Sequence, residues 1–370
     1  MDLEIKNNFE KFFFIVATIL TFNFNLQSQE LLERGRFSGY MFGDYYYNII
    51  RDTEATKLPF AIYKDPKDQN GFQFRRIYFT YDYQISDKFS SRFRLEADQF
   101  SLKNNSKISV FVKDAYLQWK DIFKGTNFIF GIQPTPTFET SESIWENRHI
   151  EMTIIDLYGL MGSRDCGISL KGKLDNSGIF NYCLLFGNGS SNRPETEKYK
   201  TIYANFLFKP TSQIIAYLNY HHKFIKPSQN KFNSKEILNR DEDLFSLFLS
   251  YNQKDIFKVG VESFFNFVHN GFDDSTNLSY INRNMFGITF FGIYYISKKF
   301  NLVFRYDFFD PNTLKDYKYD TKSFYIMCLN YKPTEKVSIS PSLLIEDFAN
   351  NPPKKYKPSI TSRIVFFFIF

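Results

Sequence analysis

The sequence contains few of the residues on which metal sites, disulfide frameworks and thiol chemistry depend. Its 370 residues include three cysteines and four histidines. Cys166, Cys183 and Cys328 are too few and too far apart for a disulfide framework or a zinc site, although one bridge between Cys166 and Cys183 across a hairpin remains an option. His221 and His222 are adjacent, so on a strand they face opposite sides and cannot share one metal ion. We predict no cofactor.

Catalytic motifs are also scarce. His149 lies beside Arg148 and Glu151, but no nucleophile motif of the Gly-x-Ser-x-Gly type accompanies it. Residues 187–190 (GNGS) lack the lysine and the following helix of a phosphate-binding loop. A triad assembled only by folding would leave no such motif. On the motifs that are present, we predict that the protein is not an enzyme.

Neither sign of charge dominates the chain, and long apolar runs are missing. Lys and Arg number 46 against 40 Asp and Glu, a formal net charge of +6, and no basic run stands out. This balance argues against a nucleic-acid partner. After Phe22 the longest apolar runs have only the length of a strand. A membrane protein with this sequence would have to be a closed β-barrel, because backbone polar groups in lipid need partners within the protein.

The N-terminus has the pattern of a secretory signal. Lys6 and Lys11 precede an apolar run over 12–22, followed by polar residues and the small Ser28. The run has about 11 residues, short of the roughly 20 that a membrane-spanning helix needs. We predict a signal peptide at 1–28 and a single exported domain at 29–370; an N-terminal core helix is the alternative.

Aromatic residues make up 20% of the chain, and they alternate with polar ones. Between residues 71 and 85, Ile77 and Phe79 fall on one face of an extended strand, whereas Arg76 and Thr80 fall on the other. Such strands run for about a dozen residues, twice the average of about 5–6 in globular proteins. One apolar and one charged face on long strands favour a barrel with lipid outside and water inside over a soluble sandwich.

Short and long connections alternate along the rest of the chain. Candidate turns lie at 86–88, 121–126, 175–178, 209–212, 253–255, 297–299 and 332–336. Longer polar segments lie near 50–70, 103–107, 133–164, 188–198, 224–242, 268–283, 310–322 and 347–358. The pattern predicts an all-β protein, a transmembrane antiparallel β-barrel of about 16 strands with periplasmic turns and extracellular loops.

The final strand ends in outward-spaced aromatic residues. Ile364, Phe366, Phe368 and Phe370 recur every second position. This end resembles the signal by which outer-membrane barrels are recognised for assembly, so we expect Phe370 to contact the barrel assembly machinery. A buried tail strand is the alternative, but it would bury the terminal carboxylate without a partner.

Several segments in order resemble the phosphate-selective porin O and P superfamily, especially relatives in Bacteroidota-like bacteria. They are 39–47 (GYMFGDYYY), 113–119 (KDAYLQW), 131–137 (GIQPTPT), 163–172 (SRDCGISLKG), 304–312 (FRYDFFDPN) and the aromatic end. The resemblance covers the mature chain. It implies a 16-stranded pore in the outer membrane, in contact with lipid and lipopolysaccharide and often a homotrimer, with a long third loop folded into the lumen.

The 133–164 segment fits that third loop. It holds Trp145, Ile154 and Leu157, which is too apolar for a disordered linker, and 156–160 is expected to form a short helical turn. We predict that it constricts the lumen. The alternatives are an external lid and a subunit contact.

Charged side chains on inward faces are the candidate pore-lining and anion-guiding residues. They are Arg76, Arg92, Arg94, Arg148, Arg164, Lys171 and Arg305. Arginine suits phosphate and carboxylate because its planar fork donates two hydrogen bonds at once. Interior salt bridges that brace the wall are the competing interpretation, since Arg305 and Asp307 share one face.

The predicted function is passive diffusion of small hydrophilic solutes and ions, including anions such as phosphate. A non-conducting structural or surface-contact barrel, plugged by its long loop, is the first alternative. A soluble secreted β protein is the second, and its exposed aromatics would be a liability in water.

Overall fold

The computed structural model describes residues 34–102, 107–274, 277–314, 320–349 and 355–370. The predicted signal peptide, 1–28, and most of the predicted 103–107 loop lie outside the described residues. Within the described part of the chain, no helix is both long enough and apolar enough to cross a membrane.

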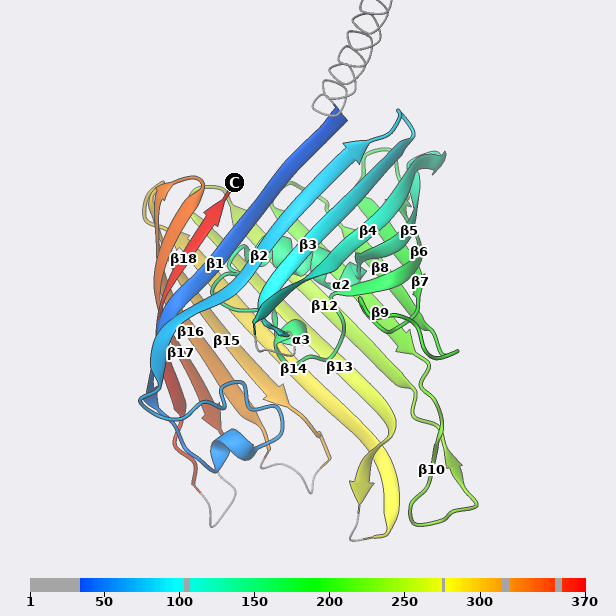
Figure 1. Cartoon of the computed structure of the whole chain (residues 1–370), viewed down its shortest axis with the longest axis vertical. Helices are drawn as coiled ribbons and strands as arrows, with labels where there is room; N and C mark the ends of the chain where they lie inside the picture. The colour runs from blue at the N-terminus through cyan, green and yellow to red at the C-terminus, as the bar shows by residue number, and fades with distance from the viewer. Residues whose placement is uncertain (1–33, 103–106, 275–276, 315–319, 350–354) are drawn as a thin grey trace, which may run out of the picture.

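Sixteen strands of the described chain close into one antiparallel barrel (Figure 1). They are β1 (Gly35–Ile50), β2 (Asn70–Gln84), β3 (Phe89–Leu102), β4 (Ile108–Phe123), β5 (Thr126–Pro134), β6 (Arg164–Lys173), β7 (Phe180–Gly187), β8 (Thr201–Phe208), β9 (Ile214–Lys223), β12 (Glu242–Gln253), β13 (Phe257–Asp274), β14 (Ser279–Tyr295), β15 (Phe300–Asp310), β16 (Lys322–Thr334), β17 (Val337–Phe348) and β18 (Ser359–Ile369). β1 and β18 close the ring, where Gly39 N–H donates to Phe370 O at 3.1 Å. The predicted fold class is confirmed.

The seven predicted turns all join consecutive strands at one end of the barrel, the upper end in Figure 1. The long connections lie at the other end. The predicted loop at 268–283 is wrong in extent, because β13 and β14 stay paired as far as Asp274 and Ser279. This hairpin extends the sheet, and it is polar because water lies on both of its faces. Its polarity therefore does not mark a loop. A second hairpin, β10 (Ser228–Gln229) with β11 (Ile237–Leu238), lies between β9 and β12.

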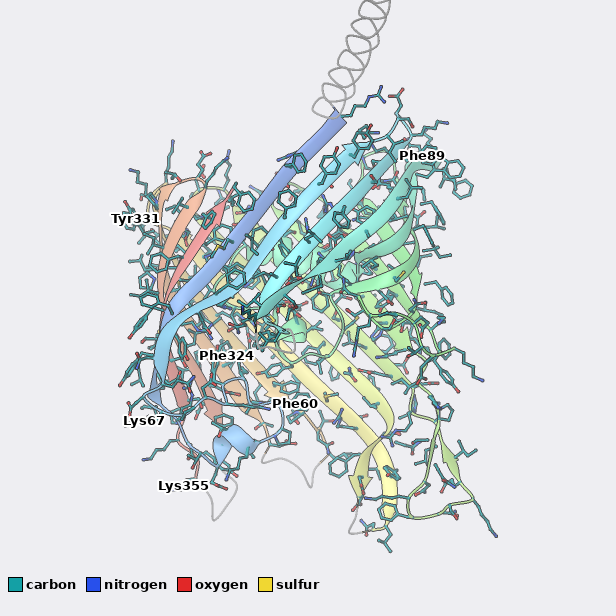
Figure 2. The ribbon with its side chains drawn as sticks, viewed as in Figure 1. Phe60, Lys67, Phe89, Phe324, Tyr331 and Lys355 are labelled. Carbon is teal, nitrogen blue, oxygen red and sulfur yellow. The ribbon has the colours of Figure 1, made fainter. Side chains whose placement is uncertain are left out.

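The outer surface is apolar on every side of the barrel. Exposed outward side chains include Phe79, Phe93, Leu117, Phe130, Ile168, Leu184, Phe206, Leu218, Leu247, Phe265, Phe290, Phe304, Met327 and Phe366. Rings cluster at the turn end, where Phe89 lies 5.4 Å from Trp119 and Phe300 lies 4.8 Å from Tyr331 (Figure 2). An apolar band with an aromatic girdle is the surface that a lipid-embedded barrel presents.

The inner surface has two unlike halves. On β1–β6 the buried inward side chains are mostly charged or polar: Asp44, Arg75, Thr80, Glu96, Lys113, Asp114, Gln133 and Ser169. On β7–β9 and β12–β17 many are apolar: Leu185, Tyr203, Tyr217, Leu244, Phe248, Phe264, Phe291, Val303, Phe309, Phe324, Ile326 and Leu344. Apolar side chains inside a barrel must be covered by protein or face water, and this asymmetry decides where the loops lie.

The cysteines do not pair. Cys166, Cys183 and Cys328 are all free. Cys183 is opposite Lys171 in the β6–β7 register. Cys183 also faces inward, whereas Cys166 lies on the outward face of β6. The proposed Cys166–Cys183 bridge is therefore wrong, because the two side chains lie on different rungs and opposite faces.

Candidate functional site: the lumen and its constriction

The third loop, L3 (residues 135–163), turns into the barrel directly after β5. It forms α2 (Pro136–Trp145) and α3 (Ile154–Leu157), both drawn within the barrel in Figure 1. Pro136 is suited to the first turn of α2, where the backbone N–H has no helical partner to lose. The predicted inward fold of L3 is confirmed, and its helical turn begins two residues earlier than expected. The longer helix α2 was not predicted.

L3 packs its apolar side chains on the apolar half of the wall. Ile144, Trp145 and Ile150 share one cluster with inward residues of β9, β12 and β14–β17, and Phe138, Ile154 and Ile155 share another with β7, β8 and β12–β15. The Trp145 ring meets Phe291 edge-on with centroids 5.2 Å apart. Trp145 is 1% exposed. Truncating a buried ring of this size costs about 3–5 kcal/mol, so L3 is firmly held.

Polar contacts hold the backbone of L3 to the same wall. The Lys258 ammonium donates to Ile144 O at 3.2 Å and pairs with the Glu146 carboxylate at 2.6 Å. Arg305 donates to Met152 O and pairs with Asp307 at 2.6 Å. These strand cations satisfy loop carbonyls that would otherwise be buried without a partner.

A second loop also folds inward. L1 (residues 51–69) sends its middle part onto L3, where Ile62 N–H donates to the Glu346 carboxylate at 3.0 Å. Tyr63 donates to Glu151 of L3 at 2.8 Å. Figure 2 shows Phe60 toward the loop end of the lumen, and its ring lies 5.3 Å from that of Phe309. The sequence pattern predicts only an external loop here, and the apolar run at 58–63 (LPFAIY) is the signal of its inward course.

A buried charge network joins L1, L3 and the wall around Glu151. Arg363 approaches the Glu151 carboxylate at 3.3 Å and Arg75 at 3.9 Å. Arg75 also pairs with Asp44 at 3.3 Å and donates to His149 O at 2.7 Å. Burial alone would raise the pKa of Glu151, but the two guanidiniums outweigh it and hold that pKa at about 2. Glu151 is therefore ionised at neutral pH.

Ion pairs also run across the inner faces of β2, β3, β4 and β6, and we call this set the charged ladder. The pairs are Arg92–Asp82 at 2.6 Å, Arg76–Glu96 at 2.6 Å, Lys113–Glu96 at 2.8 Å, Arg94–Asp114 at 3.2 Å and the close pair Arg164–Asp114. Five cations share three carboxylates. The wall of this half is thus braced by charge and retains a positive excess.

Two β-bulges add one inward cation each, Lys113 to the ladder and Arg75 to the network around Glu151. The β1–β2 register shifts between Phe42 and Gly43, so Arg75 and Arg76 both reach the lumen side. The β3–β4 register shifts between Arg94 and Leu95, which does the same for Lys113 and Asp114. Strict alternation would direct Arg75 and Lys113 to lipid, so both were missed. Adjacent charges within an otherwise apolar-outward strand are the signal that marks such a bulge.

Two cavities adjoin L3. A cavity of about 610 Å³ opens toward the loops and includes Arg148, Arg76 and residues of L1. A second cavity, of about 310 Å³, opens toward the turns and includes Glu142. Arg148 pairs with Glu142 at 3.1 Å and with Asp156 at 3.1 Å, so this ion-pair triad links a residue of the first cavity to a residue of the second.

The structure brings most of the predicted site residues together. Arg76, Arg92, Arg94 and Arg164 belong to the charged ladder, and Arg148 faces the same cavity as Arg76. Lys171 pairs with Glu139 of L3 at 2.5 Å. Arg305 lies apart, buried beneath L3 at 2% exposure. All seven are ion-paired, as the bracing interpretation expects, and their role in guiding anions stays a prediction. No group of three or more His, Cys, Asp or Glu among the described residues is arranged to hold a metal ion.

The packing of L3 predicts the behaviour of the chain's two tryptophans. In a Trp119→Phe variant, the remaining Trp145 should resist quenching by iodide and by brominated lipid, because it is enclosed between L3 and the wall. In a Trp145→Phe variant, the outward Trp119 should be quenched by brominated lipid. Strong iodide quenching of Trp145 in the folded barrel would mean that L3 is not docked.

Acid should loosen L3 from the wall. The folded pKa of Glu151 lies below its usual value of 4.5, so its stabilising effect is complete above about pH 4.5 and is lost as pH falls toward about 2. Iodide quenching of Trp145 should therefore rise only in this acid range. His149, whose pKa burial and then Arg75 lower to about 3, gains its proton in the same range. Glu151→Gln isolates the carboxylate: it should raise quenching already at neutral pH and remove most of the acid step.

No protein-family model matches the chain, and no curated protein matches it. Solved structures do. The outer membrane channel DcaP of Acinetobacter baumannii superposes with a TM-score of 0.65 at 12% identity, over 91% of this chain and 97% of that one. An anion-selective porin from Comamonas acidovorans gives 0.61 at 12% identity, over 91% and 99%. Salmonella typhi OmpF in complex with daunomycin gives 0.59 at 8% identity, over 91% and 97%.

At these identities the comparisons concern the fold, and they do not single out the phosphate-selective superfamily. The shared features are the closed ring of sixteen described strands and its span over almost the whole of each relative. Together with the apolar outer band, they place the chain in the Gram-negative outer membrane. The protein is an outer-membrane β-barrel with the fold of the general porins.

Proposed function

We propose that the barrel is a porin, a channel and not an enzyme, through which small hydrophilic solutes diffuse passively. The observation that carries this proposal is the pair of cavities that enter the barrel from opposite ends and meet at L3. L3 covers the apolar half of the wall. The remaining space is bounded by charged and polar side chains, as an aqueous passage requires.

We further propose a mild preference for anions. The side chains around the loop-side cavity include more basic than acidic groups. The basic ones are Arg51, Lys64, Arg75, Arg76, Arg148 and Arg363, and the acidic ones are Asp65, Asp98 and Glu151. A lining with one sign of charge in excess concentrates counter-ions. The preference is mild because most of these cations share carboxylates.

In this proposal the seven predicted residues act in different ways. Six of them guide anions along the charged half, and their guanidinium or ammonium groups suit phosphate and carboxylate. They are Arg76, Arg92, Arg94, Arg148, Arg164 and Lys171. Arg305 acts through L3, which it holds in place. The resemblance to phosphate-selective porins supports phosphate as one solute, and the anion-selective porin with the same fold supports the sign of the preference.

The expected partners follow from the same proposal. The barrel would lie among outer-membrane lipid and lipopolysaccharide and would associate as a homotrimer. Phe366, Phe368 and Phe370 are exposed on the last strand and would contact the assembly machinery during insertion.

One observation favours a second function, that of a non-conducting structural barrel. L1 and L3 both fill the lumen, and the Glu142–Arg148–Asp156 triad lies across the passage. A barrel plugged in this way would fold and insert normally without conducting.

Conductance separates the two functions. The refolded protein in a planar bilayer should give open channels of steady size, and a salt gradient should give a reversal potential of the sign that marks anion preference. A barrel with the heat-modifiable mobility of a folded outer-membrane protein that never conducts would support the structural function and contradict the porin.

The ion pair at the constriction supplies two matched variants. Arg148→Gln removes a positive charge from the narrow point and should shift the reversal potential toward cations. Glu142→Gln removes its partner and should shift it toward anions, because a lining with one sign of charge in excess concentrates counter-ions. Shifts of the same sign, or none, would show that solutes do not pass this triad.

A further inference from the structure

A third cavity lies at the C-terminal end of L3, beside the loop-side cavity. Its volume is about 450 Å³, and it is bounded by residues 159–162 of L3, by the β7–β8 connection and by β8, β9, β12 and β14. Phe60 of L1 borders both this cavity and the loop-side cavity of the passage, so its ring stands between the two.

The cations of this side cavity differ from those of the charged ladder. Lys223 and Arg283 on the inward faces of β9 and β14, and Arg193 in the β7–β8 connection, border the cavity. None of the three forms an ion pair with any residue that the structure describes, whereas all seven predicted site residues do. Arg164 also borders the cavity, but Asp114 neutralises it.

The acidic content of the side cavity is low. Glu242 is the carboxylate that borders it among the described residues, and its Oε1 accepts a hydrogen bond from Asn266 at 2.5 Å. Glu242 interacts electrostatically with Lys223 and Arg283 without forming an ion pair with either. Three cations therefore face one carboxylate that is already hydrogen-bonded. The local excess is positive and concentrated in one place.

Two buried polar atoms at this cavity lack partners. They are His221 Nδ1 and Arg283 Nε. His221 is 2% exposed, and its ring stacks on Tyr203 with centroids 5.1 Å apart, so it cannot turn freely to find water. Buried polar atoms are almost always hydrogen-bonded in folded proteins, and an unsatisfied one calls for an explanation. A bound polar group would supply both partners.

Part of the cavity lining is apolar. Leu160 and Met161 of L3 and Met285 of β14 border it, together with Phe60. The Arg283 guanidinium lies 5.8 Å from the centre of the Phe60 ring, so the apolar and cationic parts adjoin. A bare inorganic ion would leave these carbons facing water.

We propose that this cavity binds a small organic anion: a carboxylate held by Lys223, Arg283 and Arg193, with its apolar body against Phe60 and the L3 side chains. Charge-assisted hydrogen bonds hold the carboxylate, and the hydrophobic effect holds the body. The site is a binding site beside the passage, so it does not require that the barrel conducts.

Titration calorimetry on the folded full-length protein in detergent tests the site. Phenylacetate carries both the charge and the apolar body, acetate only the charge, and 2-phenylethanol only the body. We expect phenylacetate to bind at one site at least about tenfold more tightly than either of the others. Equal binding of inorganic phosphate and phenylacetate would overturn the apolar part of the proposal, and no binding of any probe would overturn the site.

Three substitutions locate the binding. Lys223→Gln and Arg283→Gln should each weaken phenylacetate binding by about tenfold or more, since each removes a hydrogen bond from a charged donor. Lys226→Gln makes the same charge change on an exposed side chain outside the cavity and should leave binding unchanged. Equal losses in all three would indicate a general charge effect and overturn the assignment. Heat-modifiable mobility shows that each variant is folded, and binding without conductance would refute only the proposed channel.

Discussion

The apolar half of the inner wall is the constraint on which the rest of the lumen depends. Residues such as Phe248, Phe291 and Phe324 point into the barrel, where water would otherwise reach them. Burying one such side chain stabilises a protein by roughly 1.5–3 kcal/mol, and more than ten line this half. L3 and L1 supply the cover. Because the cover lies on one side, an aqueous path can run only along the opposite, charged half.

The charged half of the inner wall must limit repulsion between its own cations. Cations on neighbouring strands repel one another unless carboxylates lie between them, and Glu96 and Asp114 each hold two. Removing one partner of a buried pair costs about 3–5 kcal/mol, because the other charge is then stranded. The ladder is therefore part of the wall's mechanical support as well as its field. Substitutions within it disturb both, which is why the half-buried triad at L3 is the cleaner probe of ion passage.

The sequence predicted the features that follow from repetition. Strands of period two, the turns between them and the inward direction of Arg76, Arg92 and Arg94 all depend on alternation, which the chain keeps. The pairing of Arg305 with Asp307 followed from the same rule. The apolar content of L3 likewise indicated that this long loop is packed against the barrel.

The predictions fail where the alternation breaks or where contacts between distant parts of the chain decide the position of a segment. One extra residue at each bulge turned Arg75 and Lys113 inward, and a single sequence gives little warning of that register shift. The inward course of L1 depends on Glu346 and Lys322, which lie 284 and 263 residues away and accept from and donate to its backbone. β16 is apolar on both faces, with Phe324 and Ile326 inward and Met327 and Leu329 outward, which is the pattern of a wall covered on both sides. Read in that way, the pattern predicts where L3 docks.

Whether a cation in the lumen has a carboxylate partner indicates whether it braces the wall or can bind a solute. A cation with a carboxylate at 2.6 Å has part of its field cancelled and its side chain fixed, so it contributes shape and stiffness together with a weakened field. A cation without one keeps its field and its hydrogen-bonding capacity for something that enters from outside. Nearly all the charge on β2–β6 is of the first kind, whereas Lys223 and Arg283 are of the second. The two kinds adjoin at Arg164, a paired cation that also borders the side cavity, so the braced wall and the chamber with unpaired charge meet at the end of L3.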